Sequence, residues 1–499
     1  MLIDTTFIDD TVQAFLEAFE VPGCAVAIVG PGTDFRAGYG VRVLGASDPV
    51  DVQTRFAAGS NTKAYTAALI GILVDRGSLD WDMPVRHHVP EFRMADPVAT
   101  ELMTLRDLLC HRSGLPLGAG DLLFYPGSTH AAADALKALP FLKLERSFRS
   151  GYAYDNILYT VAGLVIERVT GLALEDVFAR EILAPLGLAD AAPSLARLET
   201  VNVAGRHGRR GGAFIGQGPV AVVQPQGERS GFCLAAGGLQ LSISDQARWL
   251  MTQLAGGVAP SGERIWSQAQ AEQMWTPQVV MSSSDGATVD APDRPVLKSY
   301  ALGWIVQDYR GERLISHGGG LNGQITQTAL LPGRKLGVAV FSNAEGSVTT
   351  YLRNAILDHL IGVPPYDWLA ACKRHAVEAE QAALSRISHG LEAPSQGGPT
   401  LPLRAYVGRY VDPWYGQMDI SLHGDQLQMA LVPAFGLKGP LRVWGDDTFR
   451  TEFSWDAGED ALVTFHIKDA LVENVTLRAF SPLADFSYDY HHLDFKPVR

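Results

Sequence analysis

The sequence has little cysteine: four residues among 499, namely Cys24, Cys110, Cys233 and Cys372. None belongs to a CxxC pair, and no histidine stands at the spacing of a zinc finger. This pattern favours neither a disulfide framework nor a structural metal. We therefore expect buried thiols in a reducing compartment, with no metal ion and no cofactor.

Basic residues are fewer than acidic ones, with 41 Lys and Arg against 54 Asp and Glu, which gives a net charge of -13. Duplex nucleic acid is bound by clustered basic side chains, so nucleic acid is not an expected partner. No apolar run approaches the roughly 18 to 20 residues that span a bilayer, and no membrane is expected. The segment after Met1 lacks the basic stretch that begins a secretory signal. The expected location is cytoplasmic, or periplasmic if the chain has been processed.

Apolar residues, in contrast, make up 47% of the chain, and 51 Gly and 28 Pro interrupt them. A chain of this length is predicted to form about two to four domains, each with its own core. Helices are predicted over 7–20, from Ser60 onwards, over 347–361 and over 366–389, with a mostly helical block from 80 to 290. Strands are predicted over 24–29 and 35–43, up to Phe56, and over 300–306, 312–316, 325–331 and 336–342.

This order predicts one sheet that is completed by strands late in the chain, with an α-rich insertion between its two halves. The active site is expected between the sheet and the helical layer. Residues 393–400 have linker composition, which places a boundary near 395–400. Beyond it, short alternating segments broken by Gly and Asp predict a small antiparallel sheet or barrel. The predicted division is therefore 1–365, a helix and linker over 366–400, and 401–499.

Ser60 and Lys63 form the only SxxK sequence in the chain, at the predicted start of a helix. A nucleophile there feels the positive end of the helix dipole, and Lys63 lies one turn further on the same face. A desolvated lysine amine can deprotonate a serine hydroxyl. A capping serine beside a solvated lysine is an equally good interpretation of these two residues alone.

Tyr154 and Asn156 form the only Tyr-x-Asn sequence, on a predicted loop before a new helix. A phenol near a lysine ammonium can have its pKa lowered, and can then accept the serine proton and pass it to the leaving group. Asn156 could donate a hydrogen bond to a substrate carbonyl. In isolation, a core tyrosine and a helix-capping asparagine are the simpler interpretation.

His317 begins the only His-x-Gly sequence, directly after the predicted strand 312–316. The glycines that follow let the backbone approach a ligand closely, so Gly319 and Gly320 are candidate substrate-binding residues. The Gly320 amide could complete an oxyanion hole with that of Ser60, beside a strand edge able to pair with an extended substrate. A hairpin turn with a surface histidine is the simpler alternative.

Taken in order, SxxK, YxN and HxG resemble the serine hydrolases of the class C β-lactamase and penicillin-binding-protein family, including its esterases and D-aminopeptidases. The resemblance covers roughly residues 7 to 362. It extends to four further stretches, Val21-Pro-Gly, Leu105 to Leu115, Ala235-Ala-Gly-Gly-Leu239 and Ala301-Leu-Gly-Trp304.

The resemblance implies an α/β sandwich, with a β-lactamase/transpeptidase-like catalytic domain whose site lies between sheet and helical block. It implies that Ser60 is the acylated nucleophile, that Lys63 and Tyr154 form the base and proton relay, and that Asn156 binds a substrate amide. Which of Lys63 and Tyr154 is the base stays open.

His317 stands where many β-lactamases carry the lysine of a Lys-Thr-Gly motif. A histidine is mostly neutral at pH 7, so strong β-lactamase activity is not expected. His317 could stabilise the phenolate, bind substrate or only shape the strand. Arg206 and Arg209, in a basic Gly-rich segment, could clamp a substrate carboxylate, or could belong to a solvated loop.

The C-terminal segment resembles the barrel-like domain appended to some peptidases of this family. Its aromatic residues could cover the cleft, make a homo-oligomer contact, or simply form a β core. We therefore expect a metal-independent serine peptidase or amidase acting on small linear peptides with D-residues, with linearised microcystin as a candidate substrate. A carboxylesterase, and a penicillin-binding sensor that acylates without turnover, are the alternatives.

Overall fold

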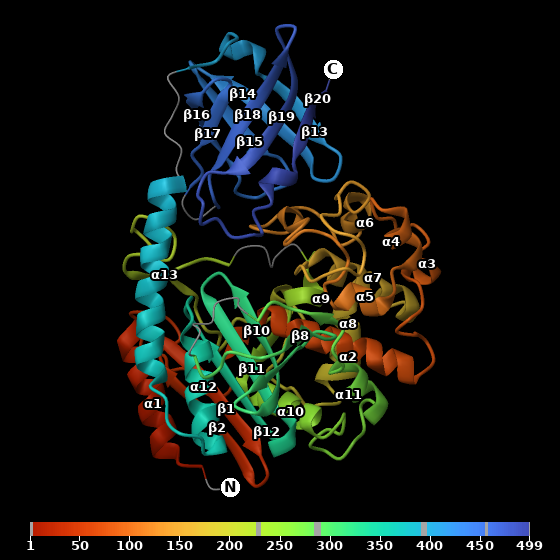
Figure 1. Ribbon diagram of the computed structural model, residues 1–499, viewed down its shortest axis with the longest axis vertical. Coiled ribbons are helices and arrows are strands. Elements are labelled where there is room, and N and C mark those ends of the chain that lie inside the picture. Colours follow the sequence, from red (N-terminus) through yellow and green to blue (C-terminus); the bar gives the residue numbers. More distant parts are fainter. Residues whose placement is uncertain (1–2, 226–230, 284–290, 391–396, 455–457, 499) are drawn as a thin grey trace.

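The computed structural model describes residues 3–225, 231–283, 291–390, 397–454 and 458–498 (Figure 1). Its larger part is built on an antiparallel sheet with strand order β2-β1-β12-β11-β10-β9-β8-β7. These strands are β1 (Gly23–Gly30), β2 (Thr33–Gly40), β7 (Val279–Val280), β8 (Lys298–Tyr300), β9 (Ile305–Tyr309), β10 (Glu312–Leu321), β11 (Gln324–Leu331) and β12 (Leu336–Ser342). The N-terminal strands and the late strands thus complete one sheet, as predicted.

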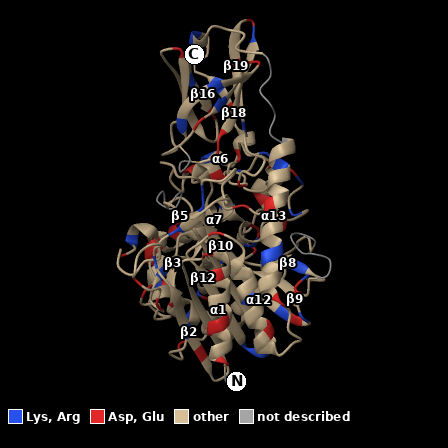
Figure 2. Ribbon diagram, turned by 90° about the vertical axis from the view of Figure 1, so that its left-hand side faces the viewer, with Lys and Arg blue, Asp and Glu red and all other residues tan. Residues whose placement is uncertain are grey.

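Strand β1 shows how both faces of the sheet are buried. Ala25 and Ala27 belong to the core shared with the helical block, whereas Val26 and Ile28 point into a second core on the opposite face. Successive residues of a strand point to opposite faces, so an unbroken apolar strand is covered on both sides. The second face is covered by α1 (Thr5–Phe19) and α12 (Val348–Ile361), which Figure 2 shows from their own side.

The other face carries the helical block, drawn mainly in orange and green in Figure 1. Its helices are α2 (Thr62–Asp75), α3 (Val85–His88), α4 (Pro97–Leu102), α5 (Leu105–Leu109), α6 (Asp134–Ala138), α7 (Ile157–Thr170), α8 (Leu174–Phe178), α9 (Leu234–Gly237), α10 (Ile243–Leu254) and α11 (Gln268–Met274). Helix α2 is buried on all sides from Thr62 to Leu73, because its sequence is apolar or small around the whole circumference. Ser60 therefore lies immediately before the N-terminus of a buried helix.

Short strand pairs complete the larger part: β3 (Arg55–Ala57) with β6 (Gln240–Ser242), and β4 (His207–Arg209) with β5 (Val220–Val222). The predicted strand 300–306 is instead two strands, β8 and β9. The chain turns between them at Gly303, whose φ of +74° suits glycine, and the Ala301 amide bonds to the Trp304 carbonyl.

Helix α13 (Trp368–Gly390) runs beside the sheet toward the C-terminal part, which is a closed antiparallel barrel (Figure 1). The barrel strands are β13 (Gly408–Asp412), β14 (Gly416–His423), β15 (Gln426–Leu431), β16 (Lys438–Gly445), β17 (Thr448–Thr451), β18 (Ala461–Lys468), β19 (Leu471–Ala479) and β20 (Asp494–Pro497). The predicted barrel is confirmed. Of the predicted linker 393–400, residues up to 396 lie outside the described part of the chain.

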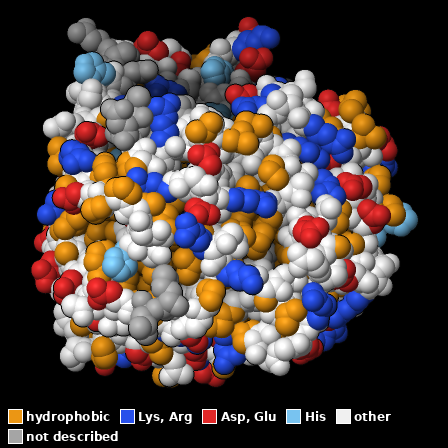
Figure 3. Space-filling view, turned by 60° about the horizontal axis from the view of Figure 1, so that its bottom comes forward, with side chains coloured by type: hydrophobic (Ala, Val, Ile, Leu, Met, Phe, Trp, Pro, Cys, Tyr) orange, Lys and Arg blue, Asp and Glu red, His pale blue; other side chains and the backbone are white. Residues whose placement is uncertain are grey.

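The surface shown in Figure 3 mixes charges of both signs with small hydrophobic groups. Over the described residues, no single helix combines the length and apolarity needed to cross a bilayer. One pair, Ile157–Thr170 with Leu174–Leu183, meets those criteria jointly but is bent by 77°.

Candidate active site

Ser60 is presented by a sharp turn between β3 and α2. Gly59 has a φ of +53°, a conformation that glycine adopts without strain, and Gly59 to Asn61 form a single 3₁₀ turn before α2 begins. A β-carbon on Gly59 would lie only 3.0 Å from the Gly320 nitrogen. The serine segment and strand β10 therefore touch backbone to backbone, as an oxyanion hole built from both would require.

Lys63 is fully buried one turn along α2, with its ammonium among oxygen atoms. Its Nζ donates to Ser60 Oγ at 3.1 Å, to Asn156 Oδ1 at 2.7 Å and to the Ala236 carbonyl at 3.2 Å. Burial lowers the pKa of Lys63 from its ordinary 10.5 to about 8. At pH 7 about a tenth of the amine is then unprotonated, far more than at the ordinary pKa, which suits a general base.

Tyr154 places its ring over the same ammonium, with Lys63 Nζ 4.7 Å from the ring centre. Burial raises the pKa of Tyr154 well above its ordinary 10, against a smaller opposing effect of a hydrogen bond with Ser60. The lowered phenol pKa expected from the sequence is therefore not what the structure indicates, because desolvation dominates over the nearby lysine. The directions of the two pKa shifts favour Lys63 over Tyr154 as the base, with Tyr154 as a protonated phenol.

Asn156 is engaged at both ends of its amide. Its Oδ1 accepts from Lys63, and its Nδ2 donates to both carboxyl oxygens of Asp121, at 3.0 and 3.3 Å. Asp121 is buried beneath the site and was not predicted as a site residue. Asn156 also lines the cavity described below, so it connects Lys63 to that cavity.

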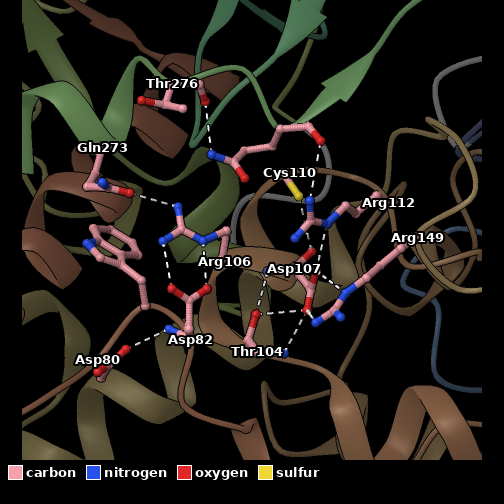
Figure 4. A network of polar contacts seen from close by, with 12 residues as sticks. Asp80, Asp82, Thr104, Arg106, Asp107, Cys110, Arg112, Arg149, Gln273 and Thr276 are labelled. Carbon is pink, nitrogen blue, oxygen red and sulfur yellow. Dashed lines mark hydrogen bonds and ion pairs between the residues drawn. The ribbon is translucent and has the colours of Figure 1, made fainter.

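The chain before Tyr154 is held by a polar network around Asp107 (Figure 4). Arg112 donates to Asp107 at 2.7 Å and Arg149 at 2.6 Å, and Thr104 also donates to it. Burial raises the pKa of Asp107, but the hydrogen bonds from Arg149, the charge of Arg112 and Thr104 together hold it below its ordinary value. This network fixes the start of the loop that carries Tyr154.

His317 lies inside strand β10, which runs on through the glycines to Leu321 and does not end at 316 as predicted. Its Nε2 lies 2.8 Å from the Tyr300 hydroxyl and its Nδ1 2.6 Å from the Gly318 carbonyl. A carbonyl only accepts, so Nδ1 carries the proton and Nε2 accepts from Tyr300. Burial and, to a lesser extent, the charge of Lys63 lower the pKa of His317 to about 3, so the ring is neutral.

The glycines of β10 pair with β11 on one side, and on the other side they form a strand edge beside Ser60 with no partner strand among the described residues. Strand β9 pairs with β10 only as far as Ser316, so the stretch from His317 to Leu321 has no β9 neighbour. A β-carbon on Gly319 would lie 2.0 Å from the Ala58 carbonyl oxygen, so only glycine fits there. A strand edge of this kind is able to pair with an extended substrate.

A cavity of about 580 Å³ opens in front of these residues. Its wall is mostly apolar and includes Ser60, Tyr154 and His317. The barrel contributes Asp485, Phe486 and Ser487 to the same wall. Among its described lining residues, two are carboxylates and none is Lys or Arg.

The two arginines that were predicted to clamp a substrate carboxylate, Arg206 and Arg209, lie outside this cavity. Arg209 pairs with Glu20 at 2.8 Å, and Arg206 is buried with its guanidinium 3.2 Å from the Asn322 carbonyl. Neither lines the cavity. Arg210 forms a two-point pair with Glu345, at 2.9 and 3.0 Å, and so neutralises one of the two cavity carboxylates. The structure thus brings Ser60, Lys63, Tyr154, Asn156, His317, Gly319 and Gly320 together, and leaves Arg206 and Arg209 outside.

Over the described residues, no three His, Cys, Asp or Glu side chains converge as metal ligands would. All four cysteines are free, and Cys233 contributes to the cavity wall. Burial raises the pKa of Cys233 to about 12, so it is a thiol and not a reactive thiolate.

Comparison with known proteins shows the family of the chain. The family model described as Beta-lactamase matches residues 8–362, which is more than two thirds of the chain. The chain belongs to the beta-lactamase family. A second model, a domain of unknown function, matches residues 392–497 and so covers the barrel. The prediction of a β-lactamase/transpeptidase-like catalytic domain followed by a C-terminal barrel is confirmed.

Unguisins hydrolase ungD of Aspergillus violaceofuscus is 30% identical over 433 residues, which cover 82% of this β-lactamase family member and 75% of the relative. The structure of the octameric penicillin-binding protein homologue from Pyrococcus abyssi aligns over 99% of this chain and all of its own, at 23% identity with a TM-score of 0.63. D-amino acid amidase from Ochrobactrum anthropi SV3 aligns over 71% of this chain and 97% of its own, at 21% identity with a TM-score of 0.57. The two structures show that the fold is shared.

Proposed function

We propose that this β-lactamase family member is a serine peptidase or amidase that cleaves small linear peptides containing D-residues through an acyl-enzyme on Ser60. The observation that carries the proposal is that the buried Lys63 amine lies 3.1 Å from the Oγ of Ser60, and that Ser60 lines the cavity. Its pKa of about 8 makes the neutral amine accessible close to neutral pH, so that it can act as a base.

In the proposed reaction, the neutral Lys63 amine takes the Ser60 proton while Oγ attacks the substrate carbonyl. The backbone amides of Ser60 and Gly320 hold the oxyanion that forms. Tyr154 donates its phenolic proton to the leaving amine and recovers one from the Lys63 ammonium. Water then attacks the acyl-enzyme ester, and its proton passes through the same pair to restore the Ser60 hydroxyl.

The free edge of β10 and the apolar cavity support a peptide substrate. A strand edge binds an extended backbone, and aromatic walls from Phe124, Tyr125 and Phe486 suit apolar side chains. The relative is named as a hydrolase of unguisins, and the structural neighbour as an amidase of D-amino acids. Linearised microcystin is the specific substrate we propose to test first.

A β-lactam is a less suitable substrate than a peptide or ester. In family members with a lysine at the position of His317, that ammonium helps to hold the carboxylate of the drug. Here the ring is neutral, and none of the described cavity-lining residues is Lys or Arg. We therefore propose weak hydrolysis of nitrocefin.

Two alternative functions use the same nucleophile. A carboxylesterase is favoured by the uncharged ring at His317, since an ester lacking a carboxylate needs no cation there. A penicillin-binding sensor is suggested by the penicillin-binding protein homologue that shares the fold. An initial burst without steady-state turnover would identify the sensor. That homologue is octameric, so we also propose self-association, which light scattering in solution tests.

The deciding experiment compares peptides that differ only in a D- or L-residue beside the scissile bond, a p-nitrophenyl ester, nitrocefin and linearised microcystin. Mass spectrometry identifies the products, with Ser60→Ala as the control. Cleavage of D-containing peptides that depends on Ser60 supports the proposal. Ester cleavage alone moves the assignment to an esterase, and activity that survives Ser60→Ala overturns the mechanism.

A further inference from the structure

Two barrel segments lie against the catalytic part of the molecule: residues 433–435, which bond to Gly127 and Thr129, and residues 485–489, which reach the cavity. Phe486 packs on Gly118, where a β-carbon would lie 2.7 Å from the Phe486 carbonyl oxygen. Asp489 is fully buried and accepts hydrogen bonds from the amides of Gly120, at 2.7 Å, and Leu122, at 3.1 Å. The second segment is therefore held in a defined position against residues 118–122.

Ser487, in the middle of this segment, begins a line of hydrogen bonds that ends at the nucleophile. Its Oγ lies 2.9 Å from Asp121 Oδ2, and Asp121 accepts from Asn156 Nδ2 at 3.0 Å. Asn156 Oδ1 accepts from Lys63 Nζ at 2.7 Å, and Lys63 donates to Ser60. The line joins groups more than 360 positions apart in the sequence.

The orientation of Asn156 depends on this line. An amide has an acceptor at one end and donors at the other, and the two ends have nearly the same shape. Lys63 can be held only by the oxygen, so the nitrogen must face an acceptor, and Asp121 is that acceptor. Ser487 occupies one oxygen of Asp121 and so keeps the carboxyl group in place.

The same line of hydrogen bonds affects the pKa values of Asp121 and Lys63. Burial and the nearby Asp489 raise the pKa of Asp121 well above its ordinary value, while Ser487, Asn156 and the Lys63 charge act in the opposite direction. Burial is the dominant effect on Lys63 and lowers its pKa, whereas negative charge on Asp121 or Asp155 acts in the opposite direction. Loss of the Ser487 hydroxyl would make Asp121 harder to ionise, and the Lys63 ammonium would lose part of its support.

We propose that Ser487 of the barrel is a positioning residue of the active site, acting through Asp121 and Asn156 on the Lys63 base. The barrel is then part of the catalytic machinery as well as a wall of the cavity. This inference rests on the proposed role of Ser60 as nucleophile, but it does not depend on the identity of the peptide substrate.

The test measures the acylation burst with a p-nitrophenyl ester in the full-length chain across a range of pH. Ser487→Ala is expected to slow acylation about tenfold, from loss of the buried hydrogen bond to the Asp121 carboxyl group, with less than a twofold change in KM. Because activity requires the neutral Lys63 amine, a lower Lys63 pKa moves the acid limb of the rate profile to lower pH. Ser421→Ala, on the exposed face of β14, is the matched control and should match wild type.

Two further variants separate positioning from general damage. Asp121→Asn keeps the shape but removes the ionisable carboxyl group, and should also move the acid limb to lower pH. In an Asn156→Ala background, Ser487→Ala should have less than a twofold further effect, because the line is already broken.

Three results would overturn the inference: normal acylation in Ser487→Ala, an unmoved acid limb, or an equal loss in the Asn156→Ala background. A burst that persists in Ser60→Ala would instead refute the proposed function itself.

Discussion

Lys63 offers the sharpest test of the site, because its burial has a consequence for stability that can be measured without any substrate. Its side chain is fully buried on α2, and burial lowers its pKa from 10.5 to about 8. Between these two values the unfolded chain binds more protons than the folded one. Stability contributed by this group must therefore rise with pH over the window from 8 to 10.5.

The size of the effect follows from linkage. A shift of one pKa unit corresponds to about 1.4 kcal/mol, so the buried ammonium costs the folded state about 3 kcal/mol at neutral pH. Near pH 10 most of this cost has gone, because the folded chain already holds the neutral amine. Between pH 7 and 10 the contribution changes by about 2.5 kcal/mol.

The perturbation is Lys63→Met, which keeps the length of the side chain and removes the charge. The free energy of unfolding is measured by urea denaturation for both proteins at several pH values, and the two curves are subtracted. The variant should be the more stable protein at pH 7, and its advantage should shrink by about 2.5 kcal/mol toward pH 10. Lys373→Met, on the exposed face of α13, should show no such trend.

The same reasoning predicts that the wild-type acylation rate rises with pH through about 8, where Lys63 becomes neutral. A difference curve between wild type and Lys63→Met that stays flat from pH 7 to 10 would show that the amine is not desolvated. An acylation rate independent of pH near 8 would show that Lys63 is not the base.

Three other residues give further predictions. His317→Asn should leave the pH profile of acylation unchanged across the neutral range, because the pKa of His317 is already about 3. Loss of a pH-dependent limb of the acylation rate in that range would contradict this prediction. Gly319→Ala should abolish activity and destabilise the fold by about 2 kcal/mol in thermal unfolding, whereas Gly398→Ala, where a β-carbon meets nothing within 4 Å, should do neither. Arg209→Ala should leave KM for acidic peptides unchanged in steady-state assays, and a rise in KM would restore the predicted clamp.

The sequence alone determined part of the candidate active site, because Ser60 and Lys63 are close together in the chain. A serine and a lysine one helical turn apart lie on the same face whatever the rest of the fold does, and so Ser60 and Lys63 could be predicted together. The short alternating segments after residue 400 could likewise form little other than an antiparallel sheet or barrel.

Tertiary structure decided which groups join that centre from a distance. Asp121 and Ser487 carry no motif, and only the docking of the barrel brings them within hydrogen-bonding distance. Arg209 looked available for a substrate, but the nearby Glu20 on the folded surface pairs with it instead. The strand through Gly319 and Gly320 could be mistaken for a turn, since glycine suits both and only the pairing with β11 distinguishes them.

Burial also decided the protonation states. From the sequence, Tyr154 near Lys63 could serve as either acid or base, because the effect of a neighbouring charge and that of desolvation have opposite signs. Only the folded structure shows that desolvation is the larger effect, raising the pKa of Tyr154 and lowering that of Lys63. Side-chain spacing is set by the local chain, whereas the exclusion of water depends on segments that are far apart in the sequence.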